Sequence, residues 1–343
     1  MKHGIIIPAI LTLLLLSACS HPKEEFVNIS GLAQGSTYSI KYCRSPKYDQ
    51  ENVKEDIGRI LSDVDNSMSV YNDSSLISRI NRNENVETDS LFNEVFRRSH
   101  EISIETEGAF DITVMPLVKA WGFGPDRHKT FNKSKLDSLL NLVGFRKVEL
   151  KGNKVVKALP GVSLDLNAIA QGYTVDLICR YFDRLGIKDY IVEVGGEVRA
   201  KGKKGGEFWK IGIDRPVDDN MVPGADLQAI IKITNKAVST SGNYRKFYIE
   251  NGVKYSHEID PKTGYPARNR VLSATIIADD CATADGFATA CMVMGLERSI
   301  SFIENKPDIQ GYLVYSDDNG NFLTWISEGL RKSIEEEAPV NNP

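Results

Sequence analysis

The residue types best suited to chemistry lie in one continuous stretch, from His257 to Thr289. It begins with the polar turn HEIDPKTGYP, where His257 and Asp260 should lie at a bend of the chain, and it ends in DDCATADGFATA. A helix that begins at Asp285 would place Thr289 one turn further along the same face. A carboxylate and a hydroxyl aimed at one point suit a hard cation such as Mg²⁺. A histidine, acidic groups and a hard-cation site together indicate phosphate chemistry.

Common catalytic signatures are missing from the sequence. It has no P-loop, no G-x-G-x-x-G after a strand, no H-E-x-x-H and no G-x-S-x-G elbow. Taken alone, Asp285 and Thr289 also fit a structural interpretation, as an N-capping acid and a helix-facing hydroxyl. The choice between the two interpretations therefore depends on the rest of the chain.

Three other segments carry unusual local patterns, and each has a structural and a functional interpretation. In 108–124 (GAFDITVMPLVKAWGFG), Phe110 and Trp121 could hold a planar ring or simply pack in the core. In 163–176 (SLDLNAIAQGYTVD), small residues at a helix start could admit a ligand or allow tight helix packing. The third segment, 237–248 (AVSTSGNYRKFY), is a polar turn between strand-forming residues and could be an ordinary hairpin loop.

The N-terminus has the layout of an export signal. Lys2 precedes an apolar run from Ile5 to Leu16, which is too short to span a bilayer comfortably and is followed by Leu-Ser-Ala-Cys. The small residues before Cys19 resemble the bacterial lipobox, so we expect a signal peptide over 1–18 and a lipid-modified Cys19. An ordinary secretory signal or an uncleaved anchor is the alternative. Residues 19–30 would form a lipidated linker.

Composition excludes several classes of protein. The formal net charge of −4 gives no support to nucleic-acid binding. The four cysteines after Cys19 form no C-x-x-C pair, which argues against zinc-ribbon and thioredoxin-like proteins. Cys281 and Cys291 lie among small and apolar residues, so buried free thiols are expected there. Residues 333–343 lack apolar periodicity and predict a disordered acidic tail, which leaves 31–332 as the catalytic domain.

Apolar periodicity predicts both helices and strands without strict alternation. Helices are expected at 51–65, at Leu76 to Ile80, at 91–102 and at 166–185 before Gly186. Strands are expected at 37–42, 190–194, 228–233, 271–278 and 311–315, with an antiparallel hairpin over 197–215. This mixture predicts an α+β fold with a mixed or antiparallel sheet, packed helices and one catalytic unit of two lobes.

The motifs occur in a characteristic order. GAFDITVMPL with WGF, DLNAIAQGY, EVGG at 193–196, STSGNYRKF, HEIDPKTGYP and ADGFATA follow one another, and MSVYNDSSLISRIN precedes them at 68–81. Together they resemble the FAD:protein FMN transferase family, the ApbE family of exported bacterial lipoproteins. The similarity extends from about Gln34 to Gly295, which is nearly all of the expected mature body.

The resemblance implies an activity and a set of site residues. Members of the family bind FAD with Mg²⁺, cut its pyrophosphate, attach the FMN part to a Thr or Ser hydroxyl of a target protein and release AMP. By position in the matching motifs, the metal ligands would be Asp285 and Thr289, with the backbone carbonyls of Ala170 and Ala288. His257 would be the base for the acceptor hydroxyl. The FAD contacts would be Gln34, Tyr71, Ala109, Phe110, Asp111, Asn167, Tyr173 and Ile259.

The chain departs from the family pattern at a few positions. Asn167 and Ala168 stand where two glycines are usual, and Gln171 stands where a lysine is usual. Gly286 and Phe287 replace Ala-Leu. The loss of the lysine removes one positive charge that could meet a phosphate, so affinity or acceptor choice could differ.

The sequence leaves two competing functions open. Water could replace the acceptor hydroxyl, which would make the protein an FAD pyrophosphatase that gives FMN and AMP, or the chain could be a non-catalytic flavin-binding lipoprotein. For a transferase, the resemblance implies exported or membrane-bound acceptor flavoproteins of electron-transfer complexes. The lipid anchor would hold the protein at the inner membrane, facing the periplasm, and no nucleic-acid partner is expected.

Overall fold

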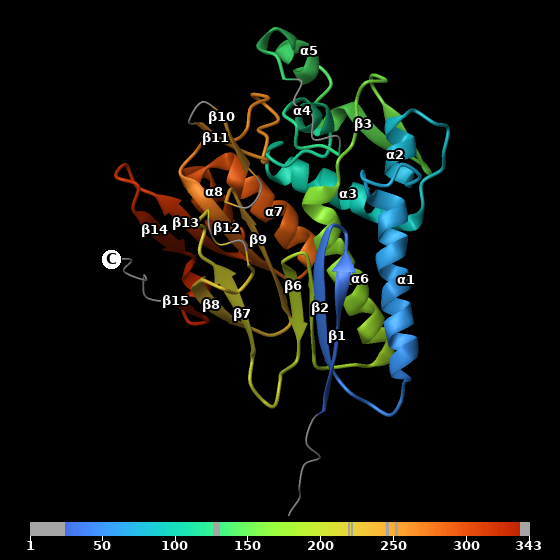
Figure 1. Cartoon of the computed structure of the whole chain (residues 1–343), viewed down its shortest axis with the longest axis vertical. Helices are drawn as coiled ribbons and strands as arrows, with labels where there is room; N and C mark the ends of the chain where they lie inside the picture. The colour runs from blue at the N-terminus through green and yellow to red at the C-terminus, as the bar shows by residue number, and fades with distance from the viewer. Residues whose placement is uncertain are drawn as a thin grey trace, which may run out of the picture.

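Figure 1 shows the computed structural model of the chain, which describes residues 25–125, 131–218, 220, 222–244, 247–250 and 253–336. The predicted signal peptide, Cys19 and most of the predicted tail lie outside these residues. Within the described part, no helix combines the length and the apolar character needed to cross a bilayer.

A central antiparallel sheet of eight strands organises the molecule. Its order is β1-β2-β5-β6-β9-β12-β13-β14, and every neighbouring pair is antiparallel. The strands are β1 (Phe26–Ala33), β2 (Ser36–Cys43), β5 (Tyr190–Val194), β6 (Glu197–Lys201), β9 (Lys236–Gly242), β12 (Val271–Ala278), β13 (Gln310–Ser316) and β14 (Phe322–Ile326). The predicted α+β class with an antiparallel sheet is confirmed, and β9 and β12 lie side by side within the sheet.

The main helices cover one face of this sheet (Figure 1). The helices of the described residues are α1 (Gln50–Met68), α2 (Leu76–Asn81), α3 (Ser90–Glu105), α4 (Met115–Ala120), α5 (Leu136–Leu140), α6 (Asn167–Leu185), α7 (Cys281–Met294) and α8 (Leu296–Glu304), with 3₁₀ turns at Lys133–Lys135, Phe145–Lys147 and Glu328–Leu330. α6 and α7 lie on the sheet, while α1 and α3 pack over them. Val192 and Val194 of β5 share one buried cluster with Val175 and Ile178 of α6. Because a strand alternates its faces, β5 presents these two valines to the same helix.

A second, three-stranded sheet covers the other face of the central sheet. Its order is β15 (Ile334–Glu336), β8 (Leu227–Ile233) and β7 (Trp209–Asp214). Ile211 and Ile231 of this sheet share a buried cluster with Val238 and Ile277 of the central sheet. Two separate hairpins complete the fold, β3 (Val148–Lys151) with β4 (Lys154–Lys157) and β10 (Phe247–Glu250) with β11 (Val253–Ser256).

The predicted hairpin over 197–215 is wrong. β6 pairs with β5 and β9, whereas β7 pairs with β8 in the other sheet. Gly202, Gly205 and Gly206 between them all have positive φ, so the chain turns away from the central sheet there. The apolar side of β7 is then buried face to face against that sheet, with Trp209 Nε1 donating to the Lys201 carbonyl at 3.0 Å.

Two predicted boundaries also shift. β1 begins at Phe26, inside the predicted linker of 19–30, because all eight of its residues pair with β2. β15 lies inside the predicted tail of 333–343, since Ile334 pairs with Ile231 and the Tyr312 hydroxyl donates to Glu336 at 3.0 Å. Backbone pairing with a neighbouring strand orders both segments.

α7 begins one turn earlier than the predicted start at Asp285. The Asp280 side chain caps the helix by accepting from the Thr283 amide at 2.9 Å. Asp176 of α6 also accepts from the amides of Cys281 and Ala282, so two carboxylates satisfy the first turn of α7. Asp285 therefore lies inside the helix, not at its cap.

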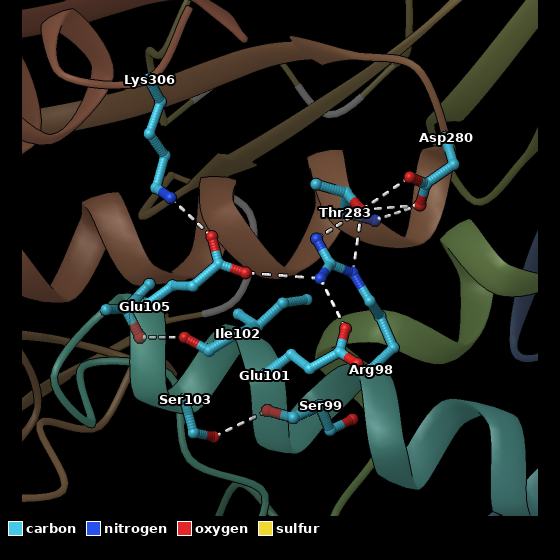
Figure 2. A network of polar contacts seen from close by, with 10 residues as sticks. Arg98, Ser99, Glu101, Ile102, Ser103, Glu105, Asp280, Thr283 and Lys306 are labelled. Carbon is cyan, nitrogen blue, oxygen red and sulfur yellow. Dashed lines mark hydrogen bonds and ion pairs between the residues drawn. The ribbon is translucent and has the colours of Figure 1, made fainter. Parts of the chain in front are cut away.

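Polar contacts from α3 hold α7 in place (Figure 2). The Arg98 guanidinium donates through Nε and Nη2 to the Thr283 hydroxyl, at 3.1 and 2.9 Å. Glu105 of α3 pairs with Arg98 of the same helix at 3.4 Å and with Lys306, which follows α8, at 2.5 Å. Gly286 allows close approach, since a Cβ there would lie 2.7 Å from Ile102 Cδ1. The helix that carries Asp285 is thus fixed from the side opposite the sheet.

Candidate functional site

The sequence motifs meet at one cavity of about 870 Å³. Its walls come from 109–124, from 165–171 at the start of α6, from the end of β9, from 257–261 after β11, and from α7. These segments are far apart in the sequence, and the order of strands and helices brings them together. Of the segment 237–248, residues 245 and 246 lie outside the described part of the chain.

The loop that follows β11 is a rigid support for His257. Its residue pair Ile259 and Pro266 forms a β-bridge, and the Ala267 amide donates to the Glu258 carbonyl at 2.7 Å. The Asp260 carboxylate accepts from the Lys262 amide at 2.8 Å. Asp260 therefore organises the bend, as the turn chemistry predicts.

The far end of this loop is anchored to Trp121, directly after α4. Trp121 Nε1 donates to the Gly264 carbonyl at 2.8 Å. Gly264 has a φ of +74°, and a Cβ there would lie 2.6 Å from Leu136 Cδ1, so only glycine fits. With both ends fixed, the loop presents the His257 side chain, which is 38% exposed, to the cavity.

Asp285 and Thr289 face the cavity from adjacent turns of α7, as their spacing predicts. Asp285 is 5% exposed, and its Oδ2 accepts from the Gly172 amide of α6 at 3.2 Å. The hydroxyls of Thr289 and Ser241 are 3.3 Å apart, which connects α7 with the end of β9. The structure thus brings the Asp285 carboxylate and the hydroxyls of Thr289 and Ser241 into one cavity, whose wall also includes His257.

The two predicted carbonyl ligands are placed differently. Neither Ala170 nor Ala288 is among the described residues that line the cavity; Ala288 is fully buried. The Ala170 carbonyl accepts from the Thr174 hydroxyl at 2.7 Å within α6. The described residues contain no cluster of three or more His, Cys, Asp or Glu side chains suited to a metal ion. Asp285 and Thr289 still offer only oxygen donors, which fits a Mg²⁺ ion that keeps waters and binds substrate phosphates.

Six of the eight predicted FAD contacts line the cavity. They are Tyr71, Ala109, Phe110, Asp111, Asn167 and Ile259. Gln34 and Tyr173 are not among the lining residues that the structure describes. The Gln34 amide donates to Thr174 Oγ1 at 2.7 Å, and the buried Tyr173 hydroxyl donates to Glu94 at 2.6 Å. Burial raises the pKa of Tyr173, in agreement with a packing role.

Asp111 is a structural carboxylate at the cavity wall. Its Oδ1 accepts from the amide and hydroxyl of Thr113, at 2.8 and 2.6 Å, and its Oδ2 accepts from the Phe145 amide at 2.7 Å. Burial raises the pKa of the Asp111 carboxyl, and these hydrogen bonds oppose the rise. The side chain therefore shapes the turn after Phe110 with its own oxygens already occupied.

The cavity wall is rich in carboxylates. Five acidic side chains belong to it, namely Asp111, Asp165, Glu197, Glu258 and Asp285. A phosphate in such surroundings needs a compensating cation, because like charges repel strongly where water is partly excluded. This acidity is a second reason to expect a divalent ion beside Asp285.

Glu258 is the functional candidate that the sequence motifs do not identify. It is 5% exposed, and within the described part of the chain neither of its carboxylate oxygens has a hydrogen-bond partner. Its Oε1 lies 3.3 Å from Nδ1 of His257. The only signal in the sequence is its place directly after the histidine, since burial cannot be read from that position.

The departures from the family pattern have visible consequences. The Gln171 side chain covers Gly195, where a Cβ would lie 2.3 Å from Gln171 Nε2. Phe287 is buried against Phe302, with ring centroids 5.0 Å apart, and Lys306 lies over its ring. Phe287 therefore packs between α7 and α8, away from the cavity.

Comparison with known proteins shows which family the chain resembles. The sequence profile of the ApbE family matches residues 34–313. The chain is 38% identical to the FAD:protein FMN transferase of Vibrio cholerae serotype O1, over 94% of this chain and 97% of that protein. It is 37% identical to the FAD:protein FMN transferase of Haemophilus influenzae, with 97% of each chain covered.

Solved structures are similar as well. The flavin transferase ApbE from Vibrio cholerae superposes with a TM-score of 0.81 at 36% identity, covering 90% of this chain and 99% of that one. The apo form of the Pseudomonas stutzeri flavinyl transferase ApbE gives a TM-score of 0.80 at 30% identity, covering 90% and 97%. Both similarities cover nine-tenths of this chain.

Proposed function

The chain belongs to the ApbE family and is a transferase, and from this premise we propose that it moves the FMN part of FAD to a Thr or Ser hydroxyl of another protein and releases AMP. One observation carries the proposal: Asp285, Thr289 and His257 come from distant segments and line the same cavity. Phosphoryl-type transfer needs these three kinds of group in one place, to hold a metal-bound phosphate and to accept a proton.

The metal site of this proposal consists of Asp285 and Thr289. A bound Mg²⁺ would neutralise charge on the pyrophosphate and act as a Lewis acid. The oxygen-only donors and the acidic cavity wall support this choice of ion. The contact between the Gly172 amide and Asp285 Oδ2 holds one carboxylate oxygen at a fixed place on the cavity wall.

His257 would take the proton of the acceptor hydroxyl. The hydroxyl oxygen then forms a bond to the phosphorus of the FMN half of FAD, and the bond from that phosphorus to the bridging oxygen breaks. The electron pair leaves with AMP, and the proton stays on the imidazole until solvent removes it. A positioned base of this kind contributes on the order of 10²–10⁴-fold to the rate.

The experiment follows both products of FAD. FAD, Mg²⁺ and a candidate exported flavoprotein are incubated with the protein, and chromatography measures AMP, free FMN and protein-bound flavin. We expect AMP and protein-bound FMN in equal amounts, with little free FMN. Free FMN formed at a comparable rate without an acceptor would instead indicate a pyrophosphatase, and FAD binding with no turnover would indicate a flavin-binding protein.

We also propose that the protein is a lipoprotein of the inner membrane that faces the periplasm. The apolar run before Leu-Ser-Ala-Cys19 supports this, and acceptors would then be membrane-bound flavoproteins of electron-transfer complexes. Metabolic labelling with a palmitate analogue tests it. Label should enter the wild type and be lost in Cys19→Ser, and equal labelling of both proteins would contradict the proposal.

A further inference from the structure

Two buried polar atoms next to the cavity have no hydrogen bond within the described part of the chain and lie beside each other. They are Nδ1 of His257 and Oε1 of Glu258, which are 3.3 Å apart. The second carboxylate oxygen of Glu258 is also buried without a partner among the described residues. Buried polar groups are normally hydrogen-bonded, so an unsatisfied pair of this kind needs an explanation.

The free-energy cost of burying Glu258 without a hydrogen-bond partner also points to a functional role for this residue. A buried carboxylate without donors destabilises the folded state, and a site with no chemical role would do better with an apolar side chain of the same size. An imidazole that carries its proton on Nδ1 would supply the missing donor. Its Nε2 would then keep a free lone pair, which is what a base requires.

The surroundings of the imidazole favour a defined orientation. Phe123 lies edge-on to the His257 ring, with centroids 6.5 Å apart and an interplanar angle of 66°. The backbone of the loop is held by the hydrogen bond from the Ala267 amide to the Glu258 carbonyl. The two side chains therefore stand on one fixed piece of backbone, and the 3.3 Å between Nδ1 and Oε1 is already within reach of a hydrogen bond.

We propose that Glu258 is a positioning residue that fixes the Nδ1–H tautomer of His257 and so turns its Nε2 toward the acceptor hydroxyl. Glu258 itself does not touch the reacting atoms; it acts through the imidazole. The inference rests on the proposed function for its effect on rate. Its effect on the tautomer is independent of turnover.

The test replaces Glu258 by an apolar side chain of similar length. The whole protein, labelled with ¹⁵N in histidine, is studied by NMR at about pH 8.5, above the ordinary histidine pKa. The His257 signals are assigned by their loss in His257→Gln. We expect Nδ1–H in the wild type and a shift toward Nε2–H in Glu258→Met. The kcat for transfer should fall roughly ten- to a hundredfold in Glu258→Met, with the KM for FAD unchanged.

Urea unfolding of the variants shows whether the substitution at Glu258 leaves the fold intact. Because Glu258→Met removes a buried charge, its resistance to urea should be equal to or greater than that of the wild type. Glu258→Gln keeps a carbonyl that can accept from Nδ1–H, so its kcat should lie between those of Glu258→Met and the wild type. Glu149→Met, at an exposed position on β3 outside the cavity, should leave both the tautomer and kcat unchanged.

Three results would overturn the proposal. They are an Nε2–H tautomer in the wild type, a kcat within twofold of wild type in Glu258→Met, and a raised KM for FAD in that variant without a change of tautomer. The last would make Glu258 a ligand contact. If the wild type modifies no acceptor at all, the proposed function fails, and the NMR result still decides the role of Glu258.

Discussion

The amide of Gly172 on α6 donates to the carboxylate of Asp285 on α7 across 3.2 Å, and no side chain could stand between them. A Cβ on Gly172 would lie 2.5 Å from the Cys281 carbonyl and 2.9 Å from Asp285 Cβ. Gly172 of the DLNAIAQGY motif and Asp285 of the ADGFATA motif therefore form one contact between the two helices. The close helix packing places the carboxylate at the cavity.

This contact predicts a large effect for Gly172→Ala. The methyl group must push α6 and α7 apart, which should lower the free energy of unfolding by about 1–3 kcal/mol. The displaced Asp285 should weaken Mg²⁺ binding roughly tenfold. Urea unfolding and calorimetric titration with Mg²⁺ measure the two effects.

Gly58→Ala is the matched control for that substitution. Gly58 lies in α1, and a Cβ there would meet nothing within 4 Å. Alanine in an exposed helix should raise the free energy of unfolding by roughly 0.5–1 kcal/mol without a change in Mg²⁺ affinity. Equal behaviour of the two variants would show that the contact between α6 and α7 does not matter.

Asp176→Ala should be among the most destabilising single substitutions. Asp176 is buried, pairs with Arg199 at 2.6 Å and accepts from the Cys281 and Ala282 amides. Its removal leaves a partly buried guanidinium and two helix amides unpaired, which should cost about 3–5 kcal/mol in urea unfolding. The exposed Asp63→Ala on α1 should stay within about 0.5 kcal/mol of wild type, and a similar small value for Asp176→Ala would refute the assignment.

Burial should protect the thiols of Cys179, Cys281 and Cys291 from alkylation. Burial raises the pKa of Cys291 to about 12 and also raises the pKa of Cys179 and Cys281. At pH 8 these thiols should resist iodoacetamide in the native protein, while the half-buried Cys43 reacts more readily. Peptide mapping before and after urea treatment measures this, and rapid native labelling of Cys291 would contradict it.

The raised pKa of Cys291 also determines how the free energy of unfolding changes with pH. The folded pKa of Cys291 lies above the value of about 8.5 that an unfolded thiol has. Its contribution to stability is therefore complete below about pH 8.5 and is lost as the pH rises toward 12. The urea midpoint should fall between pH 8 and pH 10, and a Cys291→Ala variant should show a smaller fall.

Gln171→Lys tests the position where the family usually has a lysine. An ammonium group at this part of the cavity wall should attract the phosphates of FAD, tightening binding by roughly 1 kcal/mol at low salt. Flavin fluorescence at low and high ionic strength measures the change, which should shrink as salt is added. Gln171→Met controls for the loss of the amide, and a gain in Gln171→Lys that does not depend on salt would rule out a charge effect.

The sequence predicts the helices and strands of this fold well where apolar periodicity is strong. α6, for example, ends before Gly186 as expected, and that glycine has the left-handed conformation of a helix end. The predicted start of α7 at Asp285 is one turn late, because Asp280 caps the helix through the Thr283 amide and Asp176 of α6 accepts from the Cys281 and Ala282 amides. Register and caps depend on tertiary partners.

In the site, too, sequence motifs predict some residues correctly, whereas others can be assigned only from tertiary contacts. Asp285, Thr289 and His257 line the cavity as the motifs predict, because each follows directly from its place on one element. Tyr173 also lies on α6, but its hydroxyl bonds to Glu94 and it is not among the described residues that line the cavity. A sequence motif does not show which face of its helix a neighbouring element will cover. Glu258 is missed because its unpaired burial is visible only in three dimensions.

In the proposed reaction, FMN is transferred at this cavity to a protein hydroxyl with the help of a metal ion held by Asp285. Intact-mass spectrometry of an exported acceptor flavoprotein tests it most directly, after incubation with FAD and the protein in the presence of Mg²⁺ or EDTA. We predict an FMN-mass adduct on a Thr or Ser with Mg²⁺, and none with EDTA or with Asp285→Ala. An adduct of equal yield in EDTA or with Asp285→Ala would contradict the claim.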